Sequence, residues 1–410
     1  MDGAACRRPV AWTLAALLFV LAAFVGAPGA SAATPDKDSF YAPPSSLPAK
    51  PGDLIRYRSA KFTLDPLFKL PVAGVKSFQV LYRSTTALGQ PVAVSGTVLV
   101  PTSKWSGKGP RPVVTYGVGT RGIGDQCAPS YTLSNGTDYE GLFIYSALKK
   151  GWVVLVSDMR GLGTPGLHTY EVGREQGMAL LDIVRAARQV PGSEVKADSP
   201  IGIMGYSQGG TSAGWAAQLA PVYAPELKIQ GISAGGVPAD LTDVAEYLDG
   251  GLFVGFALMA AVGYDAAYPE LNLQAYMNQR GKDLLKRGQS MCLVDVASFP
   301  TLISTLFRKF TDYTTTNPLY TPAWQARLNE NRLGSMKPPA PVFQYHGKID
   351  EIIPLGQARD LRKEWCALGA NVTYTEYSLS EHLLGMIVGA PDAINFLSDR
   401  FAGKTVRGNC

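Results

Sequence analysis

Charged residues and histidines are scarce in this chain of 410 residues. Asp, Glu, Lys and Arg make up 17% of the sequence, and histidine occurs only three times. The formal net charge of +5 is small, and the basic residues are scattered along the chain. Proteins that bind nucleic acid concentrate basic residues in a patch, so the composition gives no support for a nucleic-acid partner.

Long apolar runs are lacking beyond residue 32. The N-terminal run follows Arg7 and Arg8, extends over Val10–Val25 and leads to the small residues Ala30–Ala32. A basic start, a short apolar stretch and a small-residue site are typical of a secretory signal peptide. The run is short for a membrane anchor. We expect residues 1–32 to be cleaved near Ala32, and the mature protein to be secreted without a stable membrane span.

Cysteine is also rare, with five in the chain, and Cys6 would leave with the signal peptide. The remaining set is Cys127, Cys292, Cys366 and Cys410. An even number in an exported protein favours two disulfides, for which the sequence allows three pairings. Cys-x-x-Cys and His-x-x-x-His spacings are absent. We therefore expect no metal site, and nothing in the sequence points to a cofactor.

Against these absences stands one short motif, Gly205–Gly209, which reads Gly-Tyr-Ser-Gln-Gly. An apolar run, Pro200–Met204, precedes it, and Gln208–Ala220 can form a helix. A serine at the apex of a strand, a tight glycine-flanked turn and a helix is the form of the α/β-hydrolase nucleophile elbow. The motif predicts that Ser207 is a nucleophile.

A second match, Gly231–Gly235, places Ser233 in the same pattern. Here Gly236 and Pro238 follow, and proline so close to the turn disrupts a helix. We interpret Ser233 as a structural residue at the end of a strand over Leu227–Ala234.

Strands and helices alternate along most of the chain, which predicts an α/β fold with a mostly parallel sheet covered on both faces. Strands are expected at residues 78–84, 91–100, 113–118, 152–157, 201–204, 227–234, 341–345 and 372–377, and helices at 173–189, 208–220, 355–368 and 381–401. With the elbow, this order indicates an α/β-hydrolase fold.

The alternation stops over residues 237–338, about a hundred residues that are too long for a connecting loop. This segment includes Gly250–Val262, which is apolar nearly all round. Such a helix is buried on several sides or lines an apolar tunnel. We expect a hydrolase core in two parts, 33–236 and 339–410, with 237–338 inserted as a helical cap.

A serine nucleophile needs a base, and a histidine takes that part near neutral pH. In this fold the order along the chain is serine, acid, histidine. His168 precedes the elbow and His346 ends a strand, whereas His382 follows the last expected strand. The order favours His382 as the base; the alternative is a structural histidine at a helix N-terminus.

The acid should lie in a loop that follows a late strand, and Asp350 meets this requirement. Its neighbour Glu351 is a close rival, and Asp240 and Asp243 are further ones. We expect His346 to be a turn residue that supports the acid loop.

The oxyanion of an acyl-transfer intermediate needs two donors. The backbone N–H of Gln208, directly after the nucleophile, is the first. The second should come from the glycine-rich loop Tyr116–Gly122, through the N–H of Thr120 or Arg121. A dinucleotide site is excluded there, because Asp125, Cys127 and Pro129 follow in place of a helix.

An ordered set of motifs resembles the secretory lipase family, the lipase-A type of α/β-hydrolases, from about Tyr41 to the C-terminus. The set comprises Tyr116–Thr120, Cys127–Ser130, Gly205–Gly210, His346–Asp350 and Glu381–His382. The resemblance implies a helical lid with an acyl tunnel between nucleophile and acid. It also implies the pairings Cys127–Cys292 and Cys366–Cys410. Arg121 departs from the family member compared, which has an acid there that helps to form the oxyanion hole.

These observations predict a secreted serine hydrolase of carboxylic esters, a triacylglycerol lipase for medium or long acyl chains. The apolar cap motivates the long-chain preference. The expected partner of the protein is an ester or lipid substrate, and a lipid–water interface is a place where it would meet such a substrate. The alternatives are an esterase for short acyl or polymer esters, a serine peptidase or amidase, and a non-catalytic binding module. The oligomeric state is not readable from the sequence.

Overall fold

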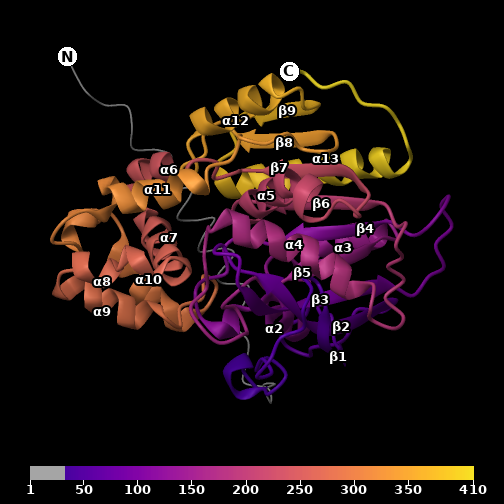
Figure 1. The fold of residues 1–410 in the computed structure, drawn as a ribbon, viewed down its shortest axis with the longest axis horizontal. Helices are drawn as coiled ribbons and strands as arrows, with labels where there is room; N and C mark the ends of the chain where they lie inside the picture. The colour runs from indigo at the N-terminus through magenta and orange to yellow at the C-terminus, as the bar shows by residue number, and fades with distance from the viewer. Residues whose placement is uncertain (1–32) are drawn as a thin grey trace.

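A nine-stranded sheet forms the centre of the computed structural model, which describes residues 33–410 (Figure 1). The predicted signal peptide, 1–32, lies outside the described residues. The spatial order of the strands is β1-β2-β3-β5-β4-β6-β7-β8-β9. Their bounds are β1 Leu54–Ala60, β2 Val75–Thr85, β3 Pro91–Pro101, β4 Val113–Gly117, β5 Val153–Ser157, β6 Ile201–Tyr206, β7 Ile229–Gly235, β8 Val342–Gly347 and β9 Val372–Tyr377.

The sheet is mostly parallel, as the alternating pattern predicted. Strands β1, β2, β3 and β5 pair antiparallel, and from β5 through β4 to β9 every pair is parallel. Strands β4, β5, β6 and β8 are buried throughout, which fits a sheet covered on both faces. The register pairs Gly117 with Gly205, so the loop after β4 emerges beside the loop after β6.

Helices cover both faces of the sheet (Figure 1). On one face lie α4 Gly173–Ala187, α5 Gln208–Tyr223 and α12 Leu355–Ala367, which share one apolar core with the strands. On the other lie α2 Pro129–Asn135, α3 Gly141–Lys149 and α13 His382–Phe401, around a second core. The fold is therefore the expected three-layer α/β arrangement.

The segment between β7 and β8 forms a separate group of helices beside the sheet (Figure 1). These are α6 Leu241–Leu248, α7 Val254–Ala267, α8 Leu273–Tyr276, α9 Gln279–Gly288, α10 Phe299–Thr305 and α11 Pro322–Glu330, with short 3-10 turns between them. Residues 237–338 are all described and contain no named strand. They pack around an apolar core that includes Tyr264, Tyr268 and Trp324.

Several elements differ from the expectation. Strand β1 and helices α2 and α3 were not predicted, and before β1 the chain forms a 3-10 turn, Pro35–Lys37, followed by buried Phe40 and Tyr41. Strand β7 begins at Ile229, two residues later than expected from Leu227, and helix α5 continues past Pro221 to Tyr223. The expected core elements are otherwise present, with shifts at their ends.

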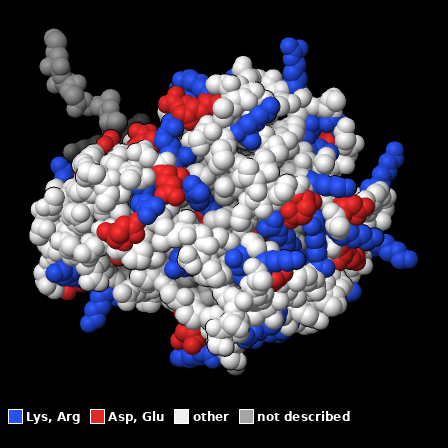
Figure 2. All heavy atoms as spheres, in the orientation of Figure 1, with Lys and Arg blue, Asp and Glu red and all other residues white. Residues whose placement is uncertain are grey.

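The surface agrees with the scattered charge of the sequence. On the face shown in Figure 2, Lys and Arg are interspersed with Asp and Glu rather than gathered into a patch of one sign. Within residues 33–410, no helix is long and apolar enough to span a bilayer.

Candidate active site

Ser207 lies in a strained turn between β6 and α5. Its φ of 59° and ψ of −125° are rare for a residue with a side chain, and its N–H donates to the carbonyl of Gly235 at 3.0 Å. A Cβ at Gly205 would clash with the carbonyl of Gly209, and a Cβ at Gly209 would clash with the carbonyl of Gly117. Glycine at both positions is therefore required for this turn.

The structure brings three predicted residues together around this turn. His382 Nε2 lies 2.9 Å from Ser207 Oγ, and His382 Nδ1 lies 2.7 Å from Asp350 Oδ2. Because an ionised carboxylate only accepts, Nδ1 carries the proton and Nε2 is free to accept from the serine hydroxyl. Asp350 follows β8, and His382 is the first residue of α13. This arrangement can activate Ser207 as a nucleophile.

Burial and charge set the protonation of this pair. Burial disfavours the imidazolium, but the carboxylate of Asp350 and its hydrogen bond outweigh burial and raise the pKa of His382. Burial alone would raise the pKa of Asp350, yet the adjacent His382 brings it below its usual value. Asp350 is therefore ionised near neutral pH and can stabilise a protonated His382.

Neighbouring side chains hold the backbone of His382. Its N–H donates to Glu351 Oε2 at 3.0 Å, and its carbonyl accepts from the hydroxyl of Tyr206 at 2.7 Å. The carboxylate of Glu381 accepts from the N–H groups of Leu383 and Leu384, which caps helix α13. Glu351, the close rival for the acid, thus contacts the backbone of His382 rather than its ring.

The other rivals lie elsewhere. Asp240 caps α6 and pairs with Arg332, and Asp243 is exposed in the first turn of the same helix. His346 is buried within β8 rather than in a turn, and its Nε2 lies 3.0 Å from the carbonyl of Ile353. It also lies 3.4 Å from the carboxylate of Asp350, so it does support the acid loop.

The remaining candidates from the sequence are structural. Ser233 is buried inside β7, paired in register with Met204. His168 is fully buried: Nδ1 donates to the carbonyl of Arg160, and Nε2 accepts from the side-chain amide of Gln208, each at 2.8 Å. His168 therefore anchors the residue that follows the nucleophile.

Of the residues expected to supply oxyanion donors, Gln208 directly follows Ser207, and Thr120 lines the same cavity. Gln208 begins α5, and the first N–H groups of a helix have no partner within the helix. In the loop after β4, the N–H of Gly119 donates to Glu140 Oε1 at 2.8 Å and is not free. Thr120 lines the same cavity as Ser207, and its carbonyl accepts from Tyr139 Oη at 2.9 Å.

The side chain of Arg121 points away from this cavity into a buried charged cluster. Its guanidinium lies 2.9 Å from Asp138 and 3.3 Å from Glu140, and it stacks 4.0 Å from the centre of the Tyr139 ring. Although burial opposes the charge, these acids hold the pKa of Arg121 above its usual value. The arginine thus anchors the loop, while its side chain is not positioned to contact an oxyanion in the cavity.

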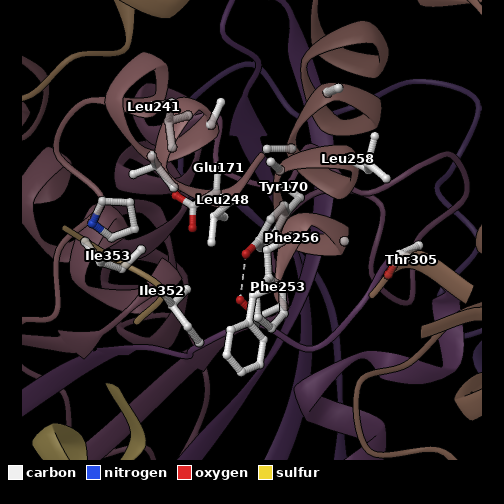
Figure 3. A pocket seen from close by; sticks show the side chains of 18 of the residues that line it. Tyr170, Glu171, Leu241, Leu248, Phe253, Phe256, Leu258, Thr305, Ile352 and Ile353 are labelled. Carbon is white, nitrogen blue, oxygen red and sulfur yellow. Dashed lines mark hydrogen bonds between the residues drawn. The ribbon is translucent and has the colours of Figure 1, made fainter. Parts of the chain in front are cut away.

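A cavity of about 360 Å³ opens above Ser207 and His382, and most of its wall is apolar (Figure 3). Helices α6, α7 and α10 supply much of the wall, including Leu241, Leu248, Phe253, Phe256 and Leu258. The acid loop adds Ile352 and Ile353. Such a cavity can hold a long apolar chain next to the nucleophile. Among the described residues, no cluster of three or more His, Cys, Asp or Glu side chains is arranged to hold a metal ion.

Two disulfides are present, with the pairing that the family resemblance implied. Cys127, near the oxyanion loop, joins Cys292 in the helical segment, and Cys366 of α12 joins Cys410 at the C-terminus. The backbone around Cys292 also pairs with Gly122. The first disulfide therefore links the helical segment to the loop that lies beside Ser207.

Three buried acids were not predicted from the sequence: Asp138 and Glu140, which hold the loop after β4, and Glu171 in the cavity wall. In the sequence, Asp138 and Glu140 look like ordinary loop acids, and Glu171 like an acid before a helix. The unusual burial of all three, with at most 9% of each residue exposed, is visible only in the folded chain.

Comparison with known proteins gives consistent results. The sequence model of the secretory lipase family matches residues 128–409. Lipase 6 of Candida albicans is 32% identical over 403 residues, which cover 92% of this chain and 83% of that protein. The secreted triacylglycerol lipase LIP1 of Malassezia furfur is 30% identical, covering 92% of this chain and 78% of its own.

Solved structures agree. Candida antarctica lipase A in its closed state superposes with a TM-score of 0.80 at 30% identity, covering 93% of this chain and 89% of that one. The rice cell wall degrading esterase LipA from Xanthomonas oryzae, at 19% identity and a TM-score of 0.70, shares the fold. The matched family model and the extent of these similarities show that the chain belongs to the secretory lipase family.

Proposed function

We propose that this protein is a secreted serine hydrolase that cleaves triacylglycerols and other medium- or long-chain acyl esters. The observation that carries the proposal is the hydrogen-bonded series from Ser207 through His382 to Asp350 at the floor of an apolar cavity. The relative from Malassezia furfur, named a secreted triacylglycerol lipase, supports the same substrate class.

In the proposed mechanism, His382 Nε2 takes the proton of Ser207 Oγ as this oxygen attacks the ester carbonyl. The carbonyl oxygen becomes an oxyanion, for which the N–H of Gln208 and an N–H of the loop around Thr120 and Arg121 serve as donors. The C–O bond to the alcohol then breaks, and His382 gives its proton to the departing alcohol. Water, deprotonated by His382, attacks the acyl-enzyme in the same way and releases the fatty acid and free Ser207.

The helical segment 237–338 is proposed to act as a cap whose cavity takes the acyl chain. The apolar wall favours a long chain, because about 25 cal/mol is gained for each Å² of apolar surface removed from water. The signal peptide at residues 1–32 would direct export.

A chain-length series with Ser207→Ala as the reference tests the proposal. Wild-type protein should hydrolyse p-nitrophenyl octanoate and emulsified trioctanoylglycerol, with kcat/KM rising from acetate to octanoate. Ser207→Ala should lose roughly 10³-fold or more in kcat while it remains folded. Activity confined to acetate would replace the lipase assignment by a short-chain esterase, and full activity of Ser207→Ala would refute the mechanism.

A further inference from the structure

Three buried side-chain oxygens of the cavity wall have no hydrogen-bond partner among the described residues: Glu140 Oε2, Glu171 Oε2 and the hydroxyl of Tyr264. Glu140 forms an ion pair with Arg121 at 3.3 Å, whereas Glu171 and Tyr264 have no such partner. Glu171 is 3% exposed and Tyr264 is 1% exposed, and both line the cavity above Ser207. Buried polar groups are usually paired, so two unpaired groups outside any ion pair, in a mostly apolar wall, require an explanation.

Glu171 lies close to the nucleophile. It precedes α4 with a φ of 60°, and its carboxyl group interacts with the side chain of Thr211, whose hydroxyl also donates to the carbonyl of Pro238 at 3.3 Å. Thr211 is one turn along α5 from Ser207, whose carbonyl accepts from the Thr211 N–H at 3.0 Å. In Figure 3 the carboxyl group of Glu171 lies among Tyr170, Leu241 and Leu248. The group thus faces the part of the cavity near the reacting serine.

Tyr264 reaches the same region from the helical segment. It belongs to α7, where the preceding Gly263 packs against the backbone of Tyr170; a Cβ at Gly263 would clash there. This close approach places α7 against Tyr170, the residue before Glu171, and the charge of Glu171 acts on the hydroxyl of Tyr264. The two unpaired groups therefore lie on opposite sides of the interface: Glu171 belongs to the core, and Tyr264 belongs to the helical segment.

The surroundings favour a neutral Glu171. Burial raises the pKa of Glu171 to about 8, even though the side chain of Thr211 and the charge of His382 act in the opposite direction. A neutral carboxyl group carries an O–H donor, and a tyrosine hydroxyl can both donate and accept. A ligand hydroxyl, which also donates and accepts, has the chemistry to pair with either group. A plain hydrocarbon chain would leave both unpaired.

We propose that Glu171 and Tyr264 form a polar subsite that selects acyl chains bearing a hydroxyl group near the ester carbonyl. This inference rests on the proposed function and names a substrate class for it, the hydroxyacyl esters. Both groups are specificity-determining residues for the bound chain rather than participants in the proton transfers. Their unpaired state lowers stability in the free protein and is relieved by the correct substrate.

A matched pair of substrates tests the subsite. The ratio of kcat/KM for p-nitrophenyl 3-hydroxyoctanoate to that for p-nitrophenyl octanoate is measured for wild type, Tyr264→Phe, Glu171→Gln and Glu171→Leu. Wild type should favour the hydroxy ester. Tyr264→Phe and Glu171→Leu should each lower the ratio about tenfold, the effect of one lost hydrogen bond. Glu171→Gln, which keeps a neutral donor, should retain most of the preference.

Tyr268→Phe is the matched control, because Tyr268 also lies at the end of α7 but bonds Asn331 and does not line the cavity. It should leave the ratio unchanged. Melting curves and fluorophosphonate labelling of Ser207 show whether each variant is folded. Placing the hydroxyl at carbons 2 to 6 in turn locates the subsite along the chain.

A ratio that stays within twofold of wild type in both Tyr264→Phe and Glu171→Leu, for every hydroxyl position, would overturn the proposal. That outcome would mean that the two groups hold only a buried water. It is distinct from failure of the proposed function, in which wild type would not hydrolyse p-nitrophenyl octanoate at all.

Discussion

Ser207 and Glu171 line one cavity, and both hold backbone conformations that side chains rarely adopt, with φ values of 59° and 60°. Such strain persists only where the surrounding structure enforces it, and it is concentrated at functional sites. For Ser207 the strain presents the hydroxyl to His382. For Glu171 it places a carboxyl group in an apolar wall. The proposed nucleophile and the proposed specificity residue thus share a strained backbone with a positive φ.

The pH dependence of activity should follow His382. The base must be neutral, and Asp350 raises the pKa of His382 against the opposing effect of burial. On the acidic side, kcat/KM should therefore fall to half of its plateau at a pH above 6.5, which is the ordinary pKa of histidine. Below that midpoint, kcat/KM should fall about tenfold for each pH unit. Measurement with a water-soluble ester from pH 5 to 9 checks this.

Asp350→Asn should shift this midpoint to lower pH, because burial then acts on His382 without the opposing carboxylate. The plateau should fall by roughly 10⁴-fold, since the imidazole loses the partner that orients it. Asp243→Asn, at an exposed acid of α6, is the control and should behave as wild type. An unshifted midpoint in Asp350→Asn would show that another group controls the titration.

Two elements illustrate how position in the fold overrides local pattern. Strand β1 lies at the edge of the sheet, and its charged residues Arg56 and Arg58 interrupt the apolar pattern by which a strand is predicted. Charged residues are common in edge strands because they oppose pairing with the strands of another molecule. Helix α7, by contrast, is apolar all round in sequence and has one side on the core of the helical segment and another on the cavity. Both interpretations of this apolar sequence therefore apply to α7: one side of the helix is buried, and another side lines an apolar space.

Narrowing the cavity from α7 should shorten the preferred acyl chain. Ala261 lines the cavity, and Ala261→Phe would fill part of its 360 Å³. We expect kcat/KM for p-nitrophenyl palmitate to fall about tenfold or more, because the lost burial of two to three methylenes is worth about 0.8 kcal/mol each. Hydrolysis of acetate should change less than twofold.

Ala266→Phe provides the matched control on the same helix, because Ala266 is partly buried but does not line the cavity. An equal loss for palmitate in both variants would mean that distortion of α7, rather than occupation of the cavity, caused the effect.

The whole molecule consists of a sheet with its covering helices and a helical segment joined to it by a disulfide. Cys127 and Cys292 are separated by 165 residues, and the bond fixes the segment next to the loop after β4. The cavity lies between these two parts, so its shape depends on how they are held together. The bond between Cys366 and Cys410 fastens only the C-terminal tail to α12.

Removing the first disulfide should loosen the helical segment before the sheet. The double variant Cys127→Ser, Cys292→Ser should lose about 2–5 kcal/mol of stability and long-chain activity. Limited proteolysis should cut first within residues 273–316. The variant Cys366→Ser, Cys410→Ser is the control, and its early cuts should fall near the C-terminus. Identical early fragments from both variants would contradict this account.

The structural features that depend on short stretches of sequence could be predicted from the sequence. The glycine pattern around Ser207 dictates a local turn, and the alternation of strands and helices dictates the layers, because both depend on interactions between near neighbours. The order of residues along the chain also predicted that His382 and Asp350 lie beside Ser207, since this fold constrains which loops meet at one edge of the sheet.

The tertiary structure alone decided which groups are buried and which partners they have. The pairing of Arg121 with Asp138 and Glu140 arises where two loops pack together, and Glu171 and Tyr264 line one cavity because the helical segment packs against the core. Burial of a polar group depends on chain segments that lie far apart in sequence, so no local pattern encodes it. The elbow therefore indicates the type of reaction, whereas the cavity wall formed between the two parts sets what the site accepts.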